Sequence, residues 1–213
     1  MSQVNGKAKN GRRTLKSIEQ LFEYGLDLKT RTVFLGSSYD EAGKEIGIDN
    51  RVTETLIKNL HLLREKRGNI RLVLNSPGGY VESGIAIYDA IRTFPYNTDI
   101  EVCGEASSMA SVILQAGRRR LLHQNAVVMI HDGTVGTDGE QSTIDRISQA
   151  KFMEYELQRM YDIYASRSSL TSEEWREKCR HDTYLTAKEA VDLGLADEII
   201  RPKHAFSKQS KKK

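Results

Sequence analysis

The chain has 213 residues, of which 38% are hydrophobic and 29% are charged, and its formal net charge is +3. This length suffices for one well-packed domain and is short for two. The sequence has no apolar run of about 18 residues, as a membrane span requires, and its basic start is not followed by the apolar segment of a secretory signal. We therefore expect a cytoplasmic protein that makes no contact with membranes.

The two ends of the chain differ in composition from its middle. Residues 1–20 and 201–213 are polar and basic, which predicts flexible tails around a domain at 21–200. Solvated tails account for the net positive charge better than nucleic-acid binding, because the sequence lacks a recognition motif and clustered aromatic residues. Cys103 and Cys179 form neither a disulfide framework nor a metal-binding pattern. We expect no nucleic acid, metal or cofactor.

Short β-branched or leucine-rich runs alternate with longer amphipathic segments, a pattern typical of a parallel sheet covered by helices. The predicted strands are residues 32–36, 70–75, 100–104, 119–122 and 126–130. The predicted helices are 51–66, 80–93, a segment that begins near Met109, and 140–168. The S/T-x-x-E sequences at 171–174 and 186–189 predict two further helix starts, and Gly194 precedes a last strand. The fold class is therefore α/β.

The helix predicted at 140–168 is long for a domain of this size. Apolar residues recur along it at helical spacing, namely Ile144, Ile147, Met153, Leu157, Met160 and Ile163. We expect part of this helix to project from the domain and to pack against another subunit.

The stretch NSPGGYVESG, residues 75–84, joins a predicted strand to a predicted helix. Gly78 and Gly79 can adopt backbone conformations that are closed to other residues, and such a turn can point amides at a developing negative oxygen. Strand-to-helix turns with glycine are common, so the glycine pair alone favours an ordinary turn over an oxyanion hole.

The stretch GEASSMAS, residues 104–111, again follows a strand and begins a helix. Ser108 is positioned at the first turn of that helix, but a serine hydroxyl is a poor nucleophile until a base accepts its proton. His131 follows a predicted strand and is the best candidate base, although a histidine in that position is more often structural. Asp132 and Asp182 can each orient it, and Asp182 is favoured because an adjacent side chain normally points the other way.

Four stretches, GEASSMAS, VVMIHDG, NSPGG and HDTYLTAKEAVDLGLADEII, together resemble the proteolytic subunit of the Clp protease family, from about Arg31 to Ile200. The resemblance implies Ser108 as nucleophile, His131 as base and Asp182 as the orienting carboxylate. It also implies an oxyanion hole formed by the backbone amides of Gly79 and Met109. Ser107 and Ser111 are then small residues that permit tight packing.

The resemblance further implies a ClpP/crotonase-like fold of repeated ββα units, in which the helix at 140–168 is the protruding handle. The expected function is that of a serine endopeptidase that cleaves unfolded polypeptides through an acyl-enzyme. The expected assembly is a homo-oligomer of stacked heptameric rings that receives substrates from an AAA+ unfoldase. The chain itself has no G-x-x-x-x-G-K-S/T loop, so we expect it not to bind nucleotide.

Several positions depart from the family pattern and suggest a divergent member, encoded by a phage or another mobile element. Arg180 and His181 replace an Asp-Arg pair that links the rings, which puts that coupling in doubt. Asp132 and Gly133 replace Gln-Pro, and the turn that follows is shortened. The connection after residue 36 is longer than usual, and residues 1–20 do not match the family's axial loop.

Two rival functions remain at the level of sequence. An acyl-CoA enzyme of the crotonase type shares the fold and the two-amide oxyanion hole, but it does not require a serine, a histidine and an aspartate together. A non-catalytic ring subunit is the other rival, and the presence of candidates at all three positions disfavours it.

Overall fold

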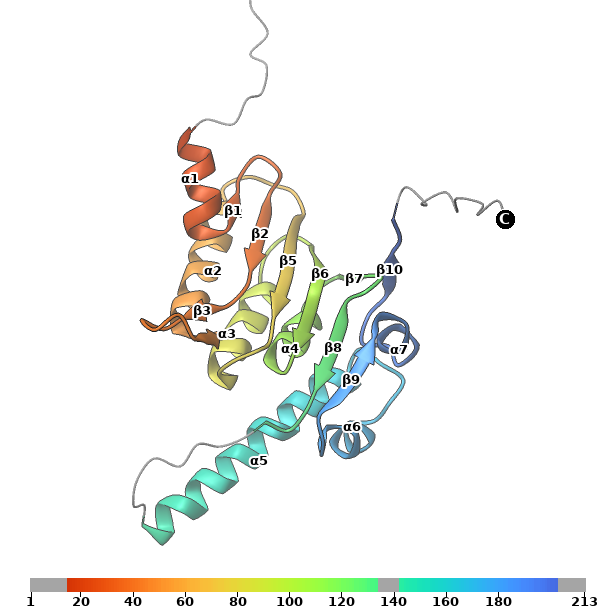
Figure 1. Ribbon diagram of the computed structural model, residues 1–213. Helices are drawn as coiled ribbons and strands as arrows, with labels where there is room; N and C mark the ends of the chain where they lie inside the picture. Colours follow the sequence, from red (N-terminus) through yellow and green to blue (C-terminus); the bar gives the residue numbers. More distant parts are fainter. Residues whose placement is uncertain (1–14, 134–141, 203–213) are drawn as a thin grey trace, which may run out of the picture.

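A computed structural model describes residues 15–133 and 142–202 (Figure 1). Within these residues, an eight-stranded sheet is accompanied by a small hairpin and seven helices. The sheet has the strand order β1-β2-β5-β6-β7-β10, and β8 pairs with both β6 and β9. In this sheet, β1 pairs antiparallel with β2, and β9 pairs antiparallel with β8. All other strand pairs of the sheet are parallel. The predicted α/β class is confirmed.

All five predicted inner strands are present, and the last strand follows Gly194 as expected. The sheet consists of β1 (Leu26–Asp27), β2 (Thr32–Leu35), β5 (Ile70–Ser76), β6 (Thr98–Ser107), β7 (Arg119–His123), β8 (Val127–Ile130), β9 (Thr183–Thr186) and β10 (Glu198–Ile200). The separate hairpin consists of β3 (Ser38–Tyr39) and β4 (Glu45–Gly47). This hairpin occupies the long connection after residue 36, where no structure was predicted.

Strand β6 changes partners halfway along its length. Its register with β5 moves from Val102 opposite Leu74 to Ala106 opposite Ser76, so residues 103–105 bulge opposite the single residue Asn75. The Asn75 side chain fills the bulge, where its Oδ1 accepts a 3.0 Å hydrogen bond from the Glu105 N–H. Strand β6 pairs with β7 as far as Val102 and with β8 from Glu105 onward. The end of β6 is thereby directed toward β8.

Four of the described helices begin after a side chain that caps them, namely Asp49, Ser142, Thr171 and Thr186. The described helices are α1 (Leu15–Tyr24), α2 (Asn50–Leu63), α3 (Val81–Arg92), α4 (Met109–Leu114), α5 (Thr143–Ala165), α6 (Ser172–Cys179) and α7 (Ala187–Asp192). Both predicted capping boxes are present, because Thr171 and Glu174 satisfy each other's backbone N–H groups, as do Thr186 and Glu189.

The core lies around β5, β6 and the short helix α4. Alternate residues of the two strands are fully buried, as in Leu72 and Leu74 of β5 and Ile100 and Val102 of β6. Every residue of α4 is buried, which explains why all of its residues except Ser111 are apolar. A fully buried helix is held on every side, so its first residue is fixed relative to the sheet.

Helix α5 projects from the body of the protein, as predicted (Figure 1). Its buried residues are confined to the last two turns, at Met160, Tyr161, Ile163 and Tyr164. Large apolar side chains near its start are exposed, including Ile144 (75%) and Ile147 (52%). The helix has 23 residues, but neither it nor any other helix in the described part of the chain is apolar enough along its length to cross a membrane.

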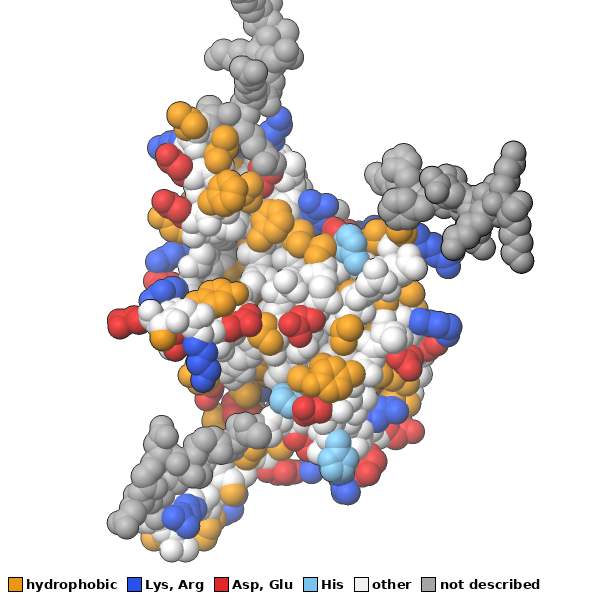
Figure 2. Space-filling model, in the orientation of Figure 1, with side chains coloured by type: hydrophobic (Ala, Val, Ile, Leu, Met, Phe, Trp, Pro, Cys, Tyr) orange, Lys and Arg blue, Asp and Glu red, His pale blue; other side chains and the backbone are white. Residues whose placement is uncertain are grey.

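Helix α1 changes one expectation, because residues 15–20 are helical although composition assigned them to a tail. Leu15, Ile18 and Phe22 recur at helical spacing, and their side chains are exposed. Figure 2 shows hydrophobic side chains on the surface in the region of this helix. The domain boundaries otherwise remain predictions. Residues 1–14 and 203–213 of the predicted tails, and the predicted shortened turn after Gly133, lie outside the described residues.

Candidate functional site

Ser108 lies between the end of β6 and the start of α4. Its backbone has φ 52° and ψ −126°, a conformation that a residue with a side chain rarely adopts and that costs about 1–3 kcal/mol. Hydrogen bonds on both sides hold it there: its N–H donates to the Met129 carbonyl at 2.8 Å, and its carbonyl accepts from the Ser111 hydroxyl at 2.6 Å. The turn presents the Ser108 hydroxyl at the end of the strand.

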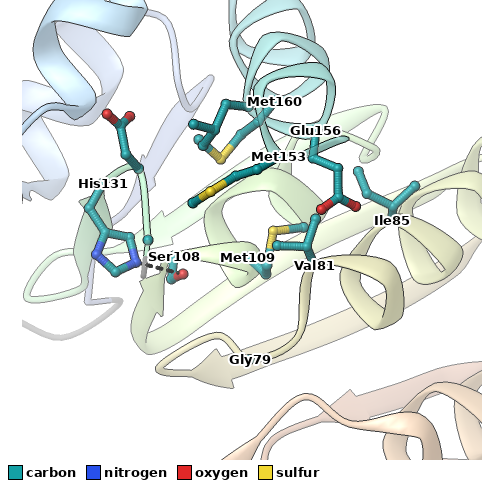
Figure 3. Close-up of a pocket in the computed structure, with 12 residues that line it drawn as sticks. Gly79, Val81, Ile85, Ser108, Met109, His131, Met153, Glu156 and Met160 are labelled. Carbon is teal, nitrogen blue, oxygen red and sulfur yellow. Dashed lines mark hydrogen bonds between the residues drawn. The ribbon is translucent and has the colours of Figure 1, made fainter. Parts of the chain in front are cut away.

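The pairing of β8 with β6 brings His131 to this hydroxyl. Ser107 is opposite Met129 in the parallel register, so His131, which follows β8, lies just beyond Ser108. The His131 Nε2 is 2.8 Å from the Ser108 Oγ (Figure 3). The imidazole is positioned to accept the hydroxyl proton.

The pairing of β9 with β8 brings Asp182 to the other side of the imidazole. Ile130 is opposite Thr183 in the antiparallel register, which places Asp182 beside His131. The Asp182 Oδ1 is 3.1 Å from the His131 Nδ1. The hydroxyl, imidazole and carboxylate thus form one continuous hydrogen-bonded line.

The two candidate aspartates, Asp132 and Asp182, make different contacts in the structure. The Asp132 carboxylate turns away from the imidazole and accepts a 2.6 Å hydrogen bond from the Tyr161 hydroxyl. Burial, together with this bond to Asp132, raises the pKa of the Tyr161 hydroxyl far above its ordinary value. Asp132 therefore serves the packing of α5, and Asp182 is the aspartate that contacts His131.

The turn between β5 and α3 lies against Ser108. Gly78 and Gly79 both have positive φ, at 101° and 157°. A Cβ on Gly78 would lie 2.6 Å from the Ser108 Cβ, so only glycine fits at this position. Ile48, after the unpredicted hairpin, donates to the Gly78 carbonyl at 2.7 Å and accepts from the Tyr80 N–H at 2.9 Å.

These bonds to Ile48 determine which way the Gly79 amide points. In a parallel pairing, the residues on either side of Gly79 face Ile48, so the N–H of Gly79 itself faces away from it. Among the described residues, the N–H groups of Gly79 and Met109 donate no hydrogen bond to the protein. Both residues line the same cavity as Ser108. The two amides predicted for an oxyanion hole are therefore free and near the hydroxyl.

A cavity of about 290 Å³ opens beside Ser108, between α3 and α5 (Figure 3). Its walls are mostly apolar and consist of Val81, Ile85, Met109, Met153, Leu157 and Met160. The three methionines are flexible and polarisable, so this surface adapts to side chains of different shape. Glu156 also lines the cavity, although the sequence analysis did not single it out. Its position three residues after Met153 and four before Met160 was the available signal.

The neighbouring serines do more than pack closely. The Ser111 hydroxyl is 2.7 Å from the Tyr164 hydroxyl, and the Ser107 hydroxyl donates to the Glu105 carboxylate at 2.7 Å. Next to Asp182, Arg180 pairs with Glu177 at 3.1 Å and His181 is exposed. A role for Arg180 and His181 in linking rings stays a prediction.

An α/β fold that presents a hydroxyl, an imidazole and a carboxylate in one line has the layout of a serine hydrolase. The family model described as Clp protease matches residues 19–203. The chain is 34% identical over 180 residues to the ATP-dependent Clp protease proteolytic subunit 4, chloroplastic, of Arabidopsis thaliana, which covers 83% of this chain and 58% of that relative. The chain thus spans well under two thirds of that relative's length. It belongs to the Clp protease family.

Proposed function

We propose that this protein is a serine endopeptidase that cleaves peptides and unfolded polypeptides through an acyl-enzyme. The observation that carries the proposal is the position of His131, which lies 2.8 Å from the Ser108 hydroxyl and 3.1 Å from the Asp182 carboxylate. Family membership supports the same reaction class.

In the proposed mechanism, His131 removes the proton of Ser108 as its Oγ attacks a peptide carbonyl. Asp182 holds the Nδ1–H of the imidazole and stabilises the imidazolium that forms. The free amides of Gly79 and Met109 stabilise the negative oxygen of the tetrahedral intermediate. His131 then donates its proton to the leaving amine, and water, activated by the same imidazole, hydrolyses the ester on Ser108.

The assembly belongs to the proposal as well. Exposed apolar side chains on the projecting part of α5 favour packing between copies of the chain, in stacked rings that enclose the sites. Because the sequence has no phosphate-binding loop, ATP dependence would come from a partner, an AAA+ unfoldase. The cytoplasmic location remains a prediction from the sequence.

The direct test is Ser108→Ala. We expect this variant to keep its fold and assembly while its kcat/KM on a fluorogenic peptide falls by about 10⁴-fold or more. It should also fail to react with a serine-directed phosphonate that labels the parent protein. Undiminished cleavage would remove Ser108 from the mechanism. A thioester assay tests the crotonase-type rival, because hydrolysis of acyl-CoA without peptide cleavage would favour that function.

A further inference from the structure

Three side chains with metal-ligating atoms meet on one face of the sheet, where the bulge in β6 begins. Glu101 and Cys103 point to the same face of β6, and His123 ends the neighbouring strand β7. The Glu101 Oε1 lies 2.7 Å from the His123 Nε2 and 3.9 Å from the Cys103 Sγ. All three atoms lie within 4.8 Å of one another. We propose that Glu101, Cys103 and His123 form a binding site for a divalent transition metal, with Zn²⁺ as the expected ion.

The spacing of the three atoms suits a tetrahedral ion. Zinc bonds of about 2.0 Å to nitrogen and oxygen and about 2.3 Å to sulfur place neighbouring ligands roughly 3.3–3.5 Å apart. The oxygen–nitrogen distance therefore has to open by about half an ångström, and the oxygen–sulfur distance has to close by a similar amount. Side-chain torsions provide movements of this size without a change in the backbone.

The residues around Glu101, Cys103 and His123 leave their ligand atoms accessible and leave room for a fourth ligand. Arg71 interacts with the other carboxylate oxygen of Glu101, Oε2, at 3.4 Å. A hollow of about 460 Å³ adjoins Cys103 and His123 and gives water access for a fourth ligand. The Glu101 side chain is 15% exposed and that of His123 is 43% exposed, so the site is half-buried and reachable.

Binding requires one proton to leave the protein. The Cys103 S–H bond breaks, the sulfur bonds to the metal and the proton passes to water, while His123 binds through the neutral Nε2 with its proton on Nδ1. Burial, and then the charge of Glu101, raises the pKa of the Cys103 thiol, and the cation reverses this effect by favouring the thiolate. A thiolate and a carboxylate together neutralise the charge of the ion.

Sequence spacing gave no sign of this site, because its ligands come from two strands that are adjacent only in the folded sheet. A bound ion would tie β6 to β7 just before β6 turns toward Ser108. We therefore expect it to stabilise the fold rather than to take part in the chemistry at Ser108.

The test uses the reduced full-length chain, titrated with Zn²⁺ and then with Co²⁺ as a spectroscopic probe. We expect one ion per chain, a rise in melting temperature and a thiolate-to-cobalt charge-transfer band. Cys103→Ser and His123→Gln should each weaken binding at least about tenfold, whereas His61→Gln, on an exposed helix face, should not. The proposal would be overturned if the parent protein bound no metal. It would also be overturned if binding showed no thiolate band and persisted in Cys103→Ser.

A second observation concerns Glu156 in the cavity beside Ser108. Its Oε1 is buried and, within the described residues, has no hydrogen-bond partner. Its side chain is 12% exposed, and the nearest cation, Arg159, lies 3.6 Å away, beyond hydrogen-bond distance. Figure 3 shows Glu156 reaching from α5 toward Val81 and Ile85 of α3. A carboxylate in this position is an unusual element of an otherwise apolar wall.

We infer that Glu156 selects substrates with a lysine or arginine on the N-terminal side of the scissile peptide bond. This inference rests on the proposed function. The methylene stem of such a side chain suits the apolar walls, and its charged end would provide the hydrogen bond that the Glu156 Oε1 lacks. Burial raises the pKa of Glu156, the charge of Glu82 adds to this effect and Arg159 opposes it. A bound substrate cation would favour the ionised carboxylate.

The test compares peptides that differ only in that residue: arginine, lysine, leucine or norleucine. We expect the parent protein to favour the basic peptides and Glu156→Gln to lose this preference by about tenfold or more. Glu154→Gln, an exposed change on the same helix, should leave it intact. The inference would be overturned if the parent protein cleaved the leucine and arginine peptides equally well, as Glu156→Gln is expected to do. If no peptide is cleaved and the phosphonate fails to label Ser108, the proposed function fails and this inference with it.

Discussion

Individual glycines set the distance between the turn at Gly78 and the Ser108 hydroxyl. A Cβ at Gly78 would lie 2.6 Å from the Ser108 Cβ and 2.7 Å from the Ser107 carbonyl. Gly43 is a matched control, because it also has a positive φ, at 77°, but an added Cβ there meets nothing within 4 Å. The two positions therefore separate the effect of crowding from the effect of backbone strain.

We expect Gly78→Ala to lower kcat/KM on a fluorogenic peptide by about 100-fold, because small displacements of a reacting group cost this much. Gly43→Ala should lower the melting temperature through strain and leave kcat/KM within about twofold of the parent. Equal activity of the two variants would show that the contact with Ser108 has no role.

The two aspartates near His131 give a second comparison at this scale. Asp182→Asn keeps the shape of the side chain but no longer holds the imidazole in the form that accepts the Ser108 proton, so kcat should fall by about 10⁴-fold. Asp132→Asn alters only the bond to Tyr161 and should affect stability more than kcat. Steady-state kinetics and thermal melts of both variants check this, and a larger loss of kcat in Asp132→Asn would contradict the assignment.

At the scale of elements, an ion pair joins β7 to the segment before β10. The Arg120 side chain is 4% exposed and donates to Asp197, to Gln115 and to the Gly194 carbonyl. Burial acts to raise the pKa of Asp197, but the hydrogen bonds and charge of Arg120 outweigh it and lower that pKa overall. The lowered pKa means that the pair stabilises the fold above the unfolded-state pKa of about 3.9 and loses this contribution as the pH falls through the folded value.

We expect Asp197→Ala to lower the free energy of unfolding by about 2–3 kcal/mol at pH 7, because it leaves Arg120 buried without its counter-ion. This is less than for a fully buried pair, since Asp197 is 37% exposed to water. Asp192→Ala, which breaks the exposed pair with Lys188, should change the free energy of unfolding far less. Urea unfolding at pH 7 and pH 3 measures both effects, and the difference between parent and Asp197→Ala should shrink at pH 3.

Sequence patterns predicted the helices and strands well where the pattern depends on residues that are close together in the chain. The strands at 70–75 and 126–130 and the capping boxes at Thr171 and Thr186 are all present, because each depends on residues close in sequence. The bulge at Asn75 was not predictable, since it arises from how two distant strands pair. The hairpin at 38–47 was missed because it is polar and glycine-containing.

The candidate site shows the same division. The sequence predicted Ser108 and His131 from their positions after strands, and it favoured Asp182 because the alternative, Asp132, adjoins His131. It predicted Gly79 and Met109 through the resemblance. It did not identify Ile48 or Glu156. Ile48 acts through its backbone, which leaves no mark in the sequence. Glu156 stands at helical spacing from Met153 and Met160, but a glutamate in a long helix is usually exposed to solvent.

At the scale of the whole molecule, the projecting part of α5 carries apolar side chains that the single chain leaves uncovered. Ile144, Ile147, Phe152 and Tyr155 are each more than half exposed along it. We expect Ile147→Asp to weaken assembly without unfolding the subunit, because it adds charge to this apolar surface. Ser148→Asp adds the same charge at an exposed polar position of the same helix and should leave assembly intact. Native mass spectrometry measures the subunit number, and equal assembly of both variants would contradict a role for this surface.

The order of the site residues along the chain also bears on how the protein is made. Ser108 and His131 are 23 residues apart, but Asp182 comes 51 residues after His131, beyond α5 and α6. During synthesis, the carboxylate that orients the imidazole is therefore the last of the three to leave the ribosome. A nascent chain carries the nucleophile and the base without the group that aligns them. In the proposed function, proteolytic activity thus arises only when the domain is almost complete, which protects the nascent chain and its neighbours from premature cleavage.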